Sequence, residues 1–187
     1  MTAYPLRVKQ IHAGSEVLDE VERWYSTPDV SQWMDGFKFS KYFKSKLGTS
    51  EDVGDEFRLD ALAWIGFDAD ECPVAFVGGE IRVPRMTSTS KSHDANVSPK
   101  VQGPQTFGFI YAVAKGYRRR GYGTRTLAAV LASPSLHDVD VFSCHIDAAN
   151  KASLQLIRGL DRFTETRAAG NKLHFQYERP SIRRHDR

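Results

Sequence analysis

A cluster of arginines and glycines near the middle of the chain has the residue types and the spacing to bind a phosphate group. Arg118, Arg119 and Arg120 are followed by Gly121 and, two positions further on, by Gly123. Glycines let an anion approach the backbone closely, and guanidinium groups add charge and paired donors. A helix that begins at these glycines would add unpaired N–H groups and the positive end of its dipole. The pattern therefore predicts a site for a phosphate or diphosphate group.

The elements around this cluster are in the order that such a site needs. Residues 107–113, FGFIYAV, form a short, aromatic and β-branched run that predicts a buried strand. Leu127 and Val130 recur at helical spacing after the glycines, and Pro134 ends the predicted helix. The alternative is a Gly-rich connector with solvated arginines. The strand, the glycines and the helix in register make that alternative the weaker interpretation.

The motif resembles the acyl-CoA signature of the GNAT acetyltransferases. The dinucleotide fingerprint GxGxxG does not fit, because Thr126 stands where its last glycine belongs, and no Gly-Lys-Ser/Thr of a Walker motif follows. Arg118-x-x-Gly121-x-Gly123 matches the family signature Gln/Arg-x-x-Gly-x-Gly/Ala. The resemblance implies acetyl-CoA as the cosubstrate, an amine as the acceptor, and no metal. The residues that it implies for acyl-CoA binding are Val113, Arg118, Arg119, Arg120, Gly121, Tyr122, Gly123, Thr124, Asn150 and Ser153.

A second segment, residues 150–163, resembles the family's Asn-x2-Ala-x2-Leu-Tyr-x2-Leu-Gly-Phe helix. In the family the asparagine reaches the pantetheine arm. An ordinary helix N-cap is the alternative for Asn150, and both roles are compatible. Two positions depart from the family pattern: Ile157 replaces a tyrosine that often protonates the departing thiolate, and Gly108 stands where some relatives carry a carboxylate base. The usual acid and the usual base are therefore both missing.

Catalysis without those side chains would rest mainly on the backbone. The resemblance implies the N–H of Val113 as the donor to the developing oxyanion, in the gap where two parallel strands separate. Such a donor is worth about 3 kcal/mol in other enzymes. The candidate bases are Glu80 and His145, and the candidate acids are Tyr111 and Tyr177. For each side chain a structural role is the favoured alternative: a solvated carboxylate at a strand end, a hydrogen-bonded strand histidine, or half-buried sheet tyrosines.

The order of elements predicts the α/β (α+β) GNAT acyl-CoA N-acyltransferase fold, with a mixed central sheet, a parallel crossover and flanking helices. A chain of 187 residues is near the size of one domain, and we expect residues 1–187 to form one. In the first half of the chain, the predicted elements are a strand at 6–11, a helix at 17–25 capped by Gly14-Ser15, a helix at 31–47, an acidic linker at 51–56, and a hairpin of 57–67 and 74–83. The pair Gly78-Gly79 in this hairpin predicts a bulge or a close approach. In the second half, the predicted elements are a strand at 107–113, a helix to 132, a strand at 139–146, a helix from Asn150, and a hairpin of 162–167 and 172–178.

Two segments lack a periodic pattern. Residues 85–105 are rich in Ser, Thr, Lys and Pro, and disorder is the favoured interpretation. The functional alternative is a flap over the acceptor site that carries His93 and Asp94. The basic residues of 180–187 predict a frayed tail.

Residues 24–33, WYSTPDVSQW, resemble an early Trp-x3-Pro-x-Val-x2-Trp pattern. The pattern is found in aminoglycoside 6′-N-acetyltransferases and in ribosomal-protein N-acetyltransferase-like relatives, where this region walls the acceptor site. A pair of core tryptophans around a helix–helix turn explains it equally well. The acceptor therefore stays open between an aminoglycoside-like polyamine, a protein N-terminus and another small amine.

The composition limits the other function classes. A net charge of +3 and a hydrophobic content of 41% suit a globule with an anionic ligand and do not require nucleic acid. No apolar run has the length of a membrane span, and MTAYPLRVKQ is not a signal peptide. Cys72 and Cys144 make no disulfide framework, so a cytoplasmic location is expected.

Two rival hypotheses come from other function classes. The first is a CoA-binding or regulatory module with little turnover, which the missing acid and base favour. The second is a nucleic-acid binder that uses the arginines and the basic tail, and the absence of a known binding motif counts against it. Whether the chain forms a homodimer is left open.

Overall fold

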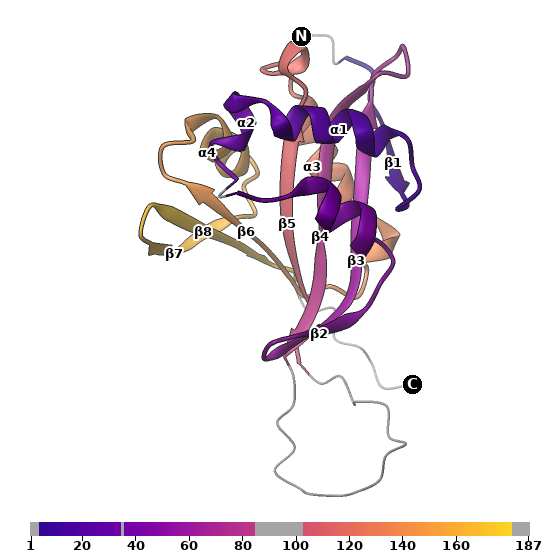
Figure 1. Ribbon diagram of the computed structural model, residues 1–187. Coiled ribbons are helices and arrows are strands. Elements are labelled where there is room, and N and C mark those ends of the chain that lie inside the picture. Colours follow the sequence, from indigo (N-terminus) through magenta and orange to yellow (C-terminus); the bar gives the residue numbers. More distant parts are fainter. Residues whose placement is uncertain (1–3, 35, 85–102, 181–187) are drawn as a thin grey trace, which may run out of the picture.

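The structure is a computed structural model in which residues 4–34, 36–84 and 103–180 are described. Their strands form one eight-stranded mixed sheet in the order β1-β3-β4-β5-β6-β8-β7, with β2 beside β3 (Figure 1). The strands are β1 (Arg7–Ile11), β2 (Glu51–Val53), β3 (Glu56–Phe67), β4 (Pro73–Pro84), β5 (Thr106–Val113), β6 (Val141–Asp147), β7 (Thr164–Ala169) and β8 (Lys172–Glu178). Among these described strands, only β5 and β6 are parallel neighbours, which the predicted crossover requires.

Helices cover both faces of this sheet (Figure 1). Over one face lie α1 (Val17–Ser26), the one-turn α2 (Pro28–Ser31) and the π-helical segment η1 (Ser40–Lys44). Over the other face lie α3 (Tyr122–Leu131) and α4 (Lys151–Arg158). Two short 3-10 segments, η2 (Lys115–Tyr117) and η3 (Pro134–Leu136), precede and follow α3.

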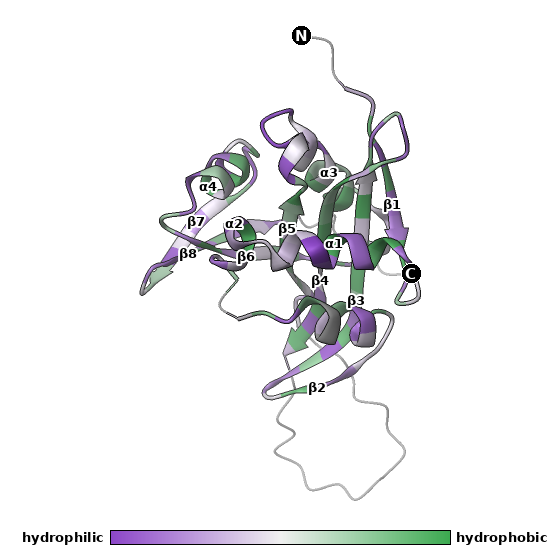
Figure 2. Ribbon diagram, turned by 45° about the horizontal axis from the view of Figure 1, so that its top comes forward, coloured by the Kyte–Doolittle hydropathy of each residue, from purple (hydrophilic) through white to green (hydrophobic). Residues whose placement is uncertain are grey.

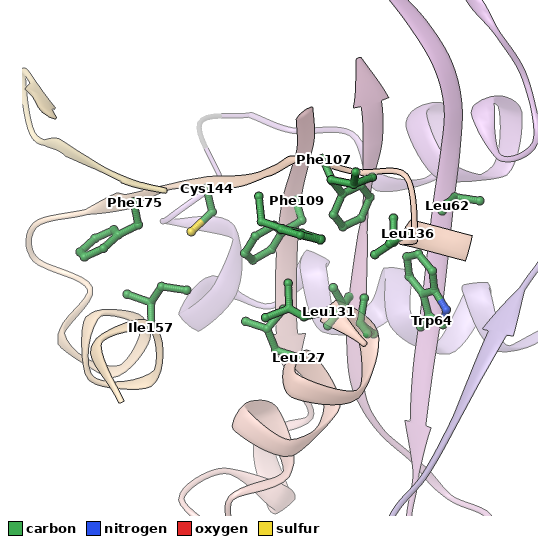
Figure 3. Packing of buried hydrophobic residues seen from close by; sticks show 14 of the residues in the cluster. Leu62, Trp64, Phe107, Phe109, Leu127, Leu131, Leu136, Cys144, Ile157 and Phe175 are labelled. Atoms are coloured by element: carbon green, nitrogen blue, oxygen red, sulfur yellow. The ribbon is translucent and has the colours of Figure 1, made fainter. Parts of the chain in front are cut away.

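Each face of the sheet buries its own hydrophobic cluster. The larger cluster contains Phe107 and Phe109 of β5 together with Leu127 of α3 and Ile157 of α4 (Figure 3). The second cluster lies under α1 and η1, around Phe76 of β4. Figure 2 shows the apolar residues concentrated on the central strands. Full burial of one such side chain contributes about 1.5–3 kcal/mol, so these clusters hold the central strands in place.

Most of the predicted elements are confirmed. The predicted strand at 107–113 is β5, the helix after the glycines is α3, and the helix from Asn150 is α4. The final hairpin is β7 and β8, joined by a two-residue turn in which Gly170 has a φ of 60°. The mixed α/β fold with its parallel β5–α3–β6 crossover is thus the predicted one.

The predicted continuous helix at 31–47 is wrong. The chain forms α2, then a turn in which Gly36 has a φ of 75°, and only then η1. A left-handed residue of this kind interrupts a right-handed helix. Phe39 and Phe43 still pack on Phe76, with ring centroids 5.3 and 5.0 Å away. The spacing of these aromatic residues therefore identified the buried face but not the break.

Two further local predictions are also wrong. Residues 51–56 are not a solvated linker, because β2 pairs with β3 and the Glu51 carboxylate lies 2.9 Å from Arg58. The helix α1 is not capped by Ser15, since its N-cap residue is Glu16 and makes no side-chain capping bond. The flap interpretation of His93 and Asp94, and residues 181–187 of the tail, lie outside the described residues.

The glycine pair in β4 marks a close approach and not a bulge. A Cβ atom on Gly79 would lie 2.1 Å from the carbonyl oxygen of Gly108, and one on Gly78 would lie 2.6 Å from the ring of Phe43. The register shifts between β3 and β4 fall elsewhere, between Arg58 and Asp60 and between Gly66 and Phe67. The pair is therefore there for packing.

Candidate active site

The candidate site begins where β5 and β6 separate. Three residue pairs join these strands, and the last of them is Gly108 with Ser143. Beyond it, β5 keeps β4 as its partner along residues 109–113, but β6 no longer pairs with it. This stretch of β5 presents an open edge, and an extended ligand can pair with the backbone of such an edge.

Val113 directs its backbone polar groups away from β4. The N–H of Ala114 donates to the carbonyl of Val74 at 3.0 Å, so Ala114 faces β4. In an antiparallel ladder, successive residues alternate between facing the partner strand and facing away. The carbonyl of Val113 agrees with this alternation, because it accepts from Nε of Arg118 at 3.1 Å. The N–H of Val113 therefore points toward the gap, as an oxyanion donor must.

The chain leaves β5 through a turn whose backbone needs glycine. Gly121 is the N-cap residue of α3 and has a φ of 78°, and Arg119 has a φ of 61°. The N–H of Arg125 donates to the carbonyl of Gly121 at 3.1 Å, which closes the first turn of α3. The N–H groups ahead of that bond have no acceptor within the helix. They belong to Tyr122, Gly123 and Thr124.

Gly123 allows the start of α3 to lie directly against the end of β5. A Cβ atom there would lie 2.7 Å from Leu156 of α4 and 2.9 Å from the side chain of Val113. The N-terminus of α3 is therefore next to the open end of β5. This arrangement fits a ligand that carries a diphosphate and an extended arm, because the helix N-terminus takes the anion and the open edge takes the arm.

The three arginines of the motif have different partners. Arg118 contacts the carbonyl of Val113 and forms an ion pair with Asp29 of α2. The guanidinium of Arg120 lies 5.7 Å from the centre of the Tyr117 ring. Arg119 and Arg120 are exposed, and neither has a carboxylate partner in the described part of the chain. These two are the arginines that remain available for phosphate.

Asn150 is the N-cap residue of α4, as the structural alternative predicted. Its side-chain oxygen accepts from the N–H of Ser153 at 3.1 Å, and the carbonyl of Ser153 accepts from the hydroxyl of Tyr111 at 3.1 Å. Burial raises the pKa of Tyr111. These bonds tie β5 to α4 and bring Tyr111, Asn150 and Ser153 together beside the open stretch of β5.

Glu80 is neither solvated nor at a strand end. It is 4% exposed and lies within β4, directly opposite Gly108. Its two oxygens accept from Nη1 of Arg58 at 2.7 Å and from Nε of Arg82 at 2.6 Å. Burial alone would raise the pKa of Glu80, but hydrogen bonds from Tyr42, Arg58 and Arg82 lower it. A carboxylate with both oxygens engaged is a weak base.

His145 lies on the same face as Glu80, and the two tyrosines lie on the opposite face. The ring of His145 stacks on that of His174 in β8, with the two ring centroids 4.5 Å apart. Burial lowers the pKa of His174, and the nearby His145 and Arg167 lower it further. Tyr177 stacks on Phe142 in the cluster under α4, with centroids 5.5 Å apart. The structure therefore does not gather the four candidate side chains around one point.

Two important residues were not found from the sequence. Arg58 is 1% exposed and holds Glu80, yet a lone arginine in a predicted strand gives no signal of burial. Asp29 is the partner of Arg118, 89 positions away, and its role depends on the fold. The sequence pattern of residues 24–33, which contains Asp29, is defined by its tryptophans and gives no signal for Asp29.

The tryptophan segment adjoins two hollows beside α1. The core interpretation holds for Trp24, which is buried, but not for Trp33, which is only half-buried. Trp24 also helps to line a pocket of about 510 Å³ with Ala114 and Tyr117. Ser26 and Ser31 help to line a second pocket, of about 230 Å³. Residues 24–33 therefore contribute both to the core and to the surface near the end of β5.

The remaining sequence features have simple structural roles. Cys144 is a buried core thiol, as predicted, and its burial raises its pKa to about 12. Within residues 4–34, 36–84 and 103–180, no helix has the length and apolar character needed to cross a membrane. The same residues contain no group of three His, Cys, Asp or Glu side chains placed to hold a metal ion.

The comparison with family models decides the family. Residues 15–161 match the model of the acetyltransferase (GNAT) family. The chain belongs to the GNAT family. The predicted family and fold are thereby confirmed. No curated protein sequence matches this GNAT chain.

The similarity to solved structures with the same fold covers nearly the whole GNAT chain. An aminoglycoside N(6′)-acetyltransferase from Legionella pneumophila has a TM-score of 0.63 at 14% identity, covering 95% of this chain and 94% of that one. NAA60 from Arabidopsis thaliana, solved in complex with acetyl-CoA, has a TM-score of 0.58 at 16% identity, covering 93% and 98%. A domain from Methanocaldococcus jannaschii has a TM-score of 0.63 at 13% identity, covering 94% and 99%. At these identities the likeness is one of fold.

Proposed function

We propose that this GNAT chain transfers an acetyl group from acetyl-CoA to a primary amine. One observation carries the proposal: the open edge of β5 beyond Gly108 ends beside the N-terminus of α3. The backbone N–H groups of Tyr122, Gly123 and Thr124, with the Arg119 and Arg120 side chains, would hold the diphosphate. The pantetheine arm would pair along residues 109–113, with Asn150 and Ser153 beside it.

The reaction needs a fixed thioester and a neutral amine. The amine nitrogen attacks the carbonyl carbon, the C–N bond forms, and the C–S bond breaks to release a thiolate that takes up a proton. The N–H of Val113 would donate to the carbonyl oxygen as it gains negative charge, a contribution of about 3 kcal/mol. Alignment of the two reactants supplies up to about 7–11 kcal/mol. Most of the acceleration thus comes from positioning by the backbone.

Among the candidate side chains, His145 fits the role of base best. It is exposed on the face of the sheet that α2 and η1 border, two residues beyond Ser143. Glu80 is occupied by its two arginines, and Tyr177 is stacked in the core. Tyr111 remains the candidate acid beside the open edge, although its hydroxyl donates to Ser153. Solvent is the other proton carrier, since Ile157 is a buried aliphatic residue.

For the acceptor we propose a small amine or a protein N-terminus, in a cytoplasmic setting. The proposal is supported by the similarity of residues 24–33 to acceptor-wall segments and by the two pockets that these residues adjoin. The solved structures with this fold include an aminoglycoside acetyltransferase, so the fold is compatible with a small amine as the acceptor. Function depends on the site and not on the fold.

A second candidate is a CoA-binding module with little turnover. It is favoured by Ile157, which is 0% exposed, and by Gly108, which provides no side chain opposite Glu80. Thiol release from acetyl-CoA, followed across a panel of aminoglycosides, polyamines and short peptides, separates the two functions. Sustained release that depends on one amine supports transfer. Tight binding of acetyl-CoA with no release for any amine would support the module instead.

A further inference from the structure

The ion pair between Arg118 and Asp29 separates the first arginine of the motif from the other two. The side chains of Arg118 and Asp29 are each 36% exposed, whereas Arg119 and Arg120 lie on the surface. The guanidinium of Arg118 uses Nε for the carbonyl of Val113 and Nη1 for Asp29. With Nε and Nη1 engaged in this way, the guanidinium of Arg118 contacts β5 and α2.

Asp29 belongs to a short helix whose apolar contact is limited to Val30, which is half-buried against the cluster under α1. The helix α2 has four residues, and none of them is buried. A single turn of helix is not stable on its own. Pro28 at its first position and Asp29 in its first turn favour the helical start. The Thr27 hydroxyl and the Arg118 guanidinium lower the pKa of Asp29, so it is ionised and able to pair at neutral pH.

The pair spans the two parts of the candidate site. Both views of the ribbon show α2 in front of the region between β5 and β6 (Figures 1 and 2). The same guanidinium fixes the carbonyl of Val113, whose N–H is the proposed oxyanion donor. One side chain thus links the helix beside the proposed acceptor region to the catalytic end of β5.

We infer that Asp29 is a positioning residue: through Arg118 it holds α2 over the open edge of β5 and fixes the carbonyl of Val113, the residue whose N–H is the proposed oxyanion donor. This inference rests on the proposed function. It also gives the arginines different roles: Arg118 orders the acceptor side of the site, and Arg119 and Arg120 bind the diphosphate.

The first test measures the order of α2 and does not depend on turnover. Hydrogen exchange of the amides of residues 27–34 is compared in the wild type, Asp29→Ala, Arg118→Ala and the double variant. An exposed pair of this kind is worth up to about 1 kcal/mol, so each single variant should exchange about fivefold faster in α2. The double variant should be no faster than either single one. Unchanged exchange in Asp29→Ala would overturn the inference.

The second test separates positioning from cofactor binding. In calorimetry, Asp29→Ala should bind acetyl-CoA within twofold of the wild type, whereas Arg119→Ala, the matched control one position beyond Arg118, should bind it several-fold more weakly. With an amine that supports thiol release, Asp29→Ala should lower kcat about tenfold at an unchanged KM for acetyl-CoA. Asp29→Glu should restore part of the loss, because it keeps the charge.

The two hypotheses fail in different ways. If Asp29→Ala binds acetyl-CoA as weakly as Arg119→Ala does, the separate roles assigned to Arg118 and to Arg119 and Arg120 would be overturned. A wild-type chain that does not bind acetyl-CoA at all would contradict the proposed function, while the exchange experiment would still decide whether the pair holds α2.

Discussion

Two groups of arginines in this protein have opposite environments. Arg58 and Arg82 surround Glu80 in β4, and the chain itself supplies their anions. Arg119 and Arg120 lie beside the first turn of α3, where no described carboxylate pairs with them and three backbone N–H groups have no acceptor within the helix. The first group is a closed structural network, and the second is open to a ligand. Both groups consist of arginines, so what distinguishes the candidate binding site from the structural network is whether carboxylates of the described chain already pair with them.

The largest expected effect is on the closed group. In Glu80→Gln the buried Arg58 loses its buried charged partner and keeps only Glu51, whose side chain is 39% exposed. Removing one member of a buried pair costs about 3–5 kcal/mol. Urea unfolding should show this loss in the free energy of unfolding. The matched control is Glu56→Gln, because Glu56 pairs with Arg82 at 3.1 Å while being 45% exposed. Such a surface pair is worth about 0–1 kcal/mol. Equal effects of both variants would contradict the distinction.

The next effect is on the open group. Gly121→Val forces a β-branched residue into a φ of 78°, and Gly123→Val pushes against Leu156 and Val113. Both should weaken acetyl-CoA binding at least about tenfold in calorimetry, because the backbone donors would move.

Gly54→Val is the control for backbone strain. Gly54 also has a positive φ, of 60°, and open surroundings, but it lies in the turn between β2 and β3. This variant should lose stability and keep its affinity for acetyl-CoA. Wild-type affinity in both Gly121→Val and Gly123→Val would refute the binding of the diphosphate by this turn.

The smallest effect is a dependence of stability on pH. The pKa of Glu80 lies below its ordinary value of 4.5 in the folded state. The folded state therefore binds fewer protons than the unfolded state in this range, and the stabilisation is complete above pH 4.5 and lost as the pH falls through the lowered pKa. The difference in unfolding free energy between the wild type and Glu80→Gln should narrow below pH 4.5. A constant difference down to pH 3 would show that the charge of Glu80 is not what stabilises the fold.

The sequence was most informative where local pattern and chain order agree. The run FGFIYAV, the glycines at 121 and 123 and the periodic apolar residues after them specify strand, turn and helix independently of the rest of the chain. Asn150 was recognisable as a helix start for the same reason. These local signals are enough to predict the fold and the proposed cofactor side of the site.

The sequence was least informative where long-range contacts decide the structure. The aromatic spacing of residues 31–47 favours one helix, but the left-handed Gly36 divides it. Glu51 appeared to be part of an acidic linker because its cationic partner Arg58 is brought to it by the pairing of β2 with β3. Glu80 was interpreted as solvated for the same reason. Pairing across strands cannot be inferred from residue types alone.

A crystal structure of the protein with CoA tests the central claim most directly. We predict the diphosphate against the N–H groups of Tyr122, Gly123 and Thr124, the pantetheine arm along residues 109–113, and the sulfur beside the N–H of Val113. CoA bound at another place on the protein would contradict the account. A crystal structure in which β5 and β6 stay paired beyond Gly108, with CoA excluded from the space between them, would contradict it as well.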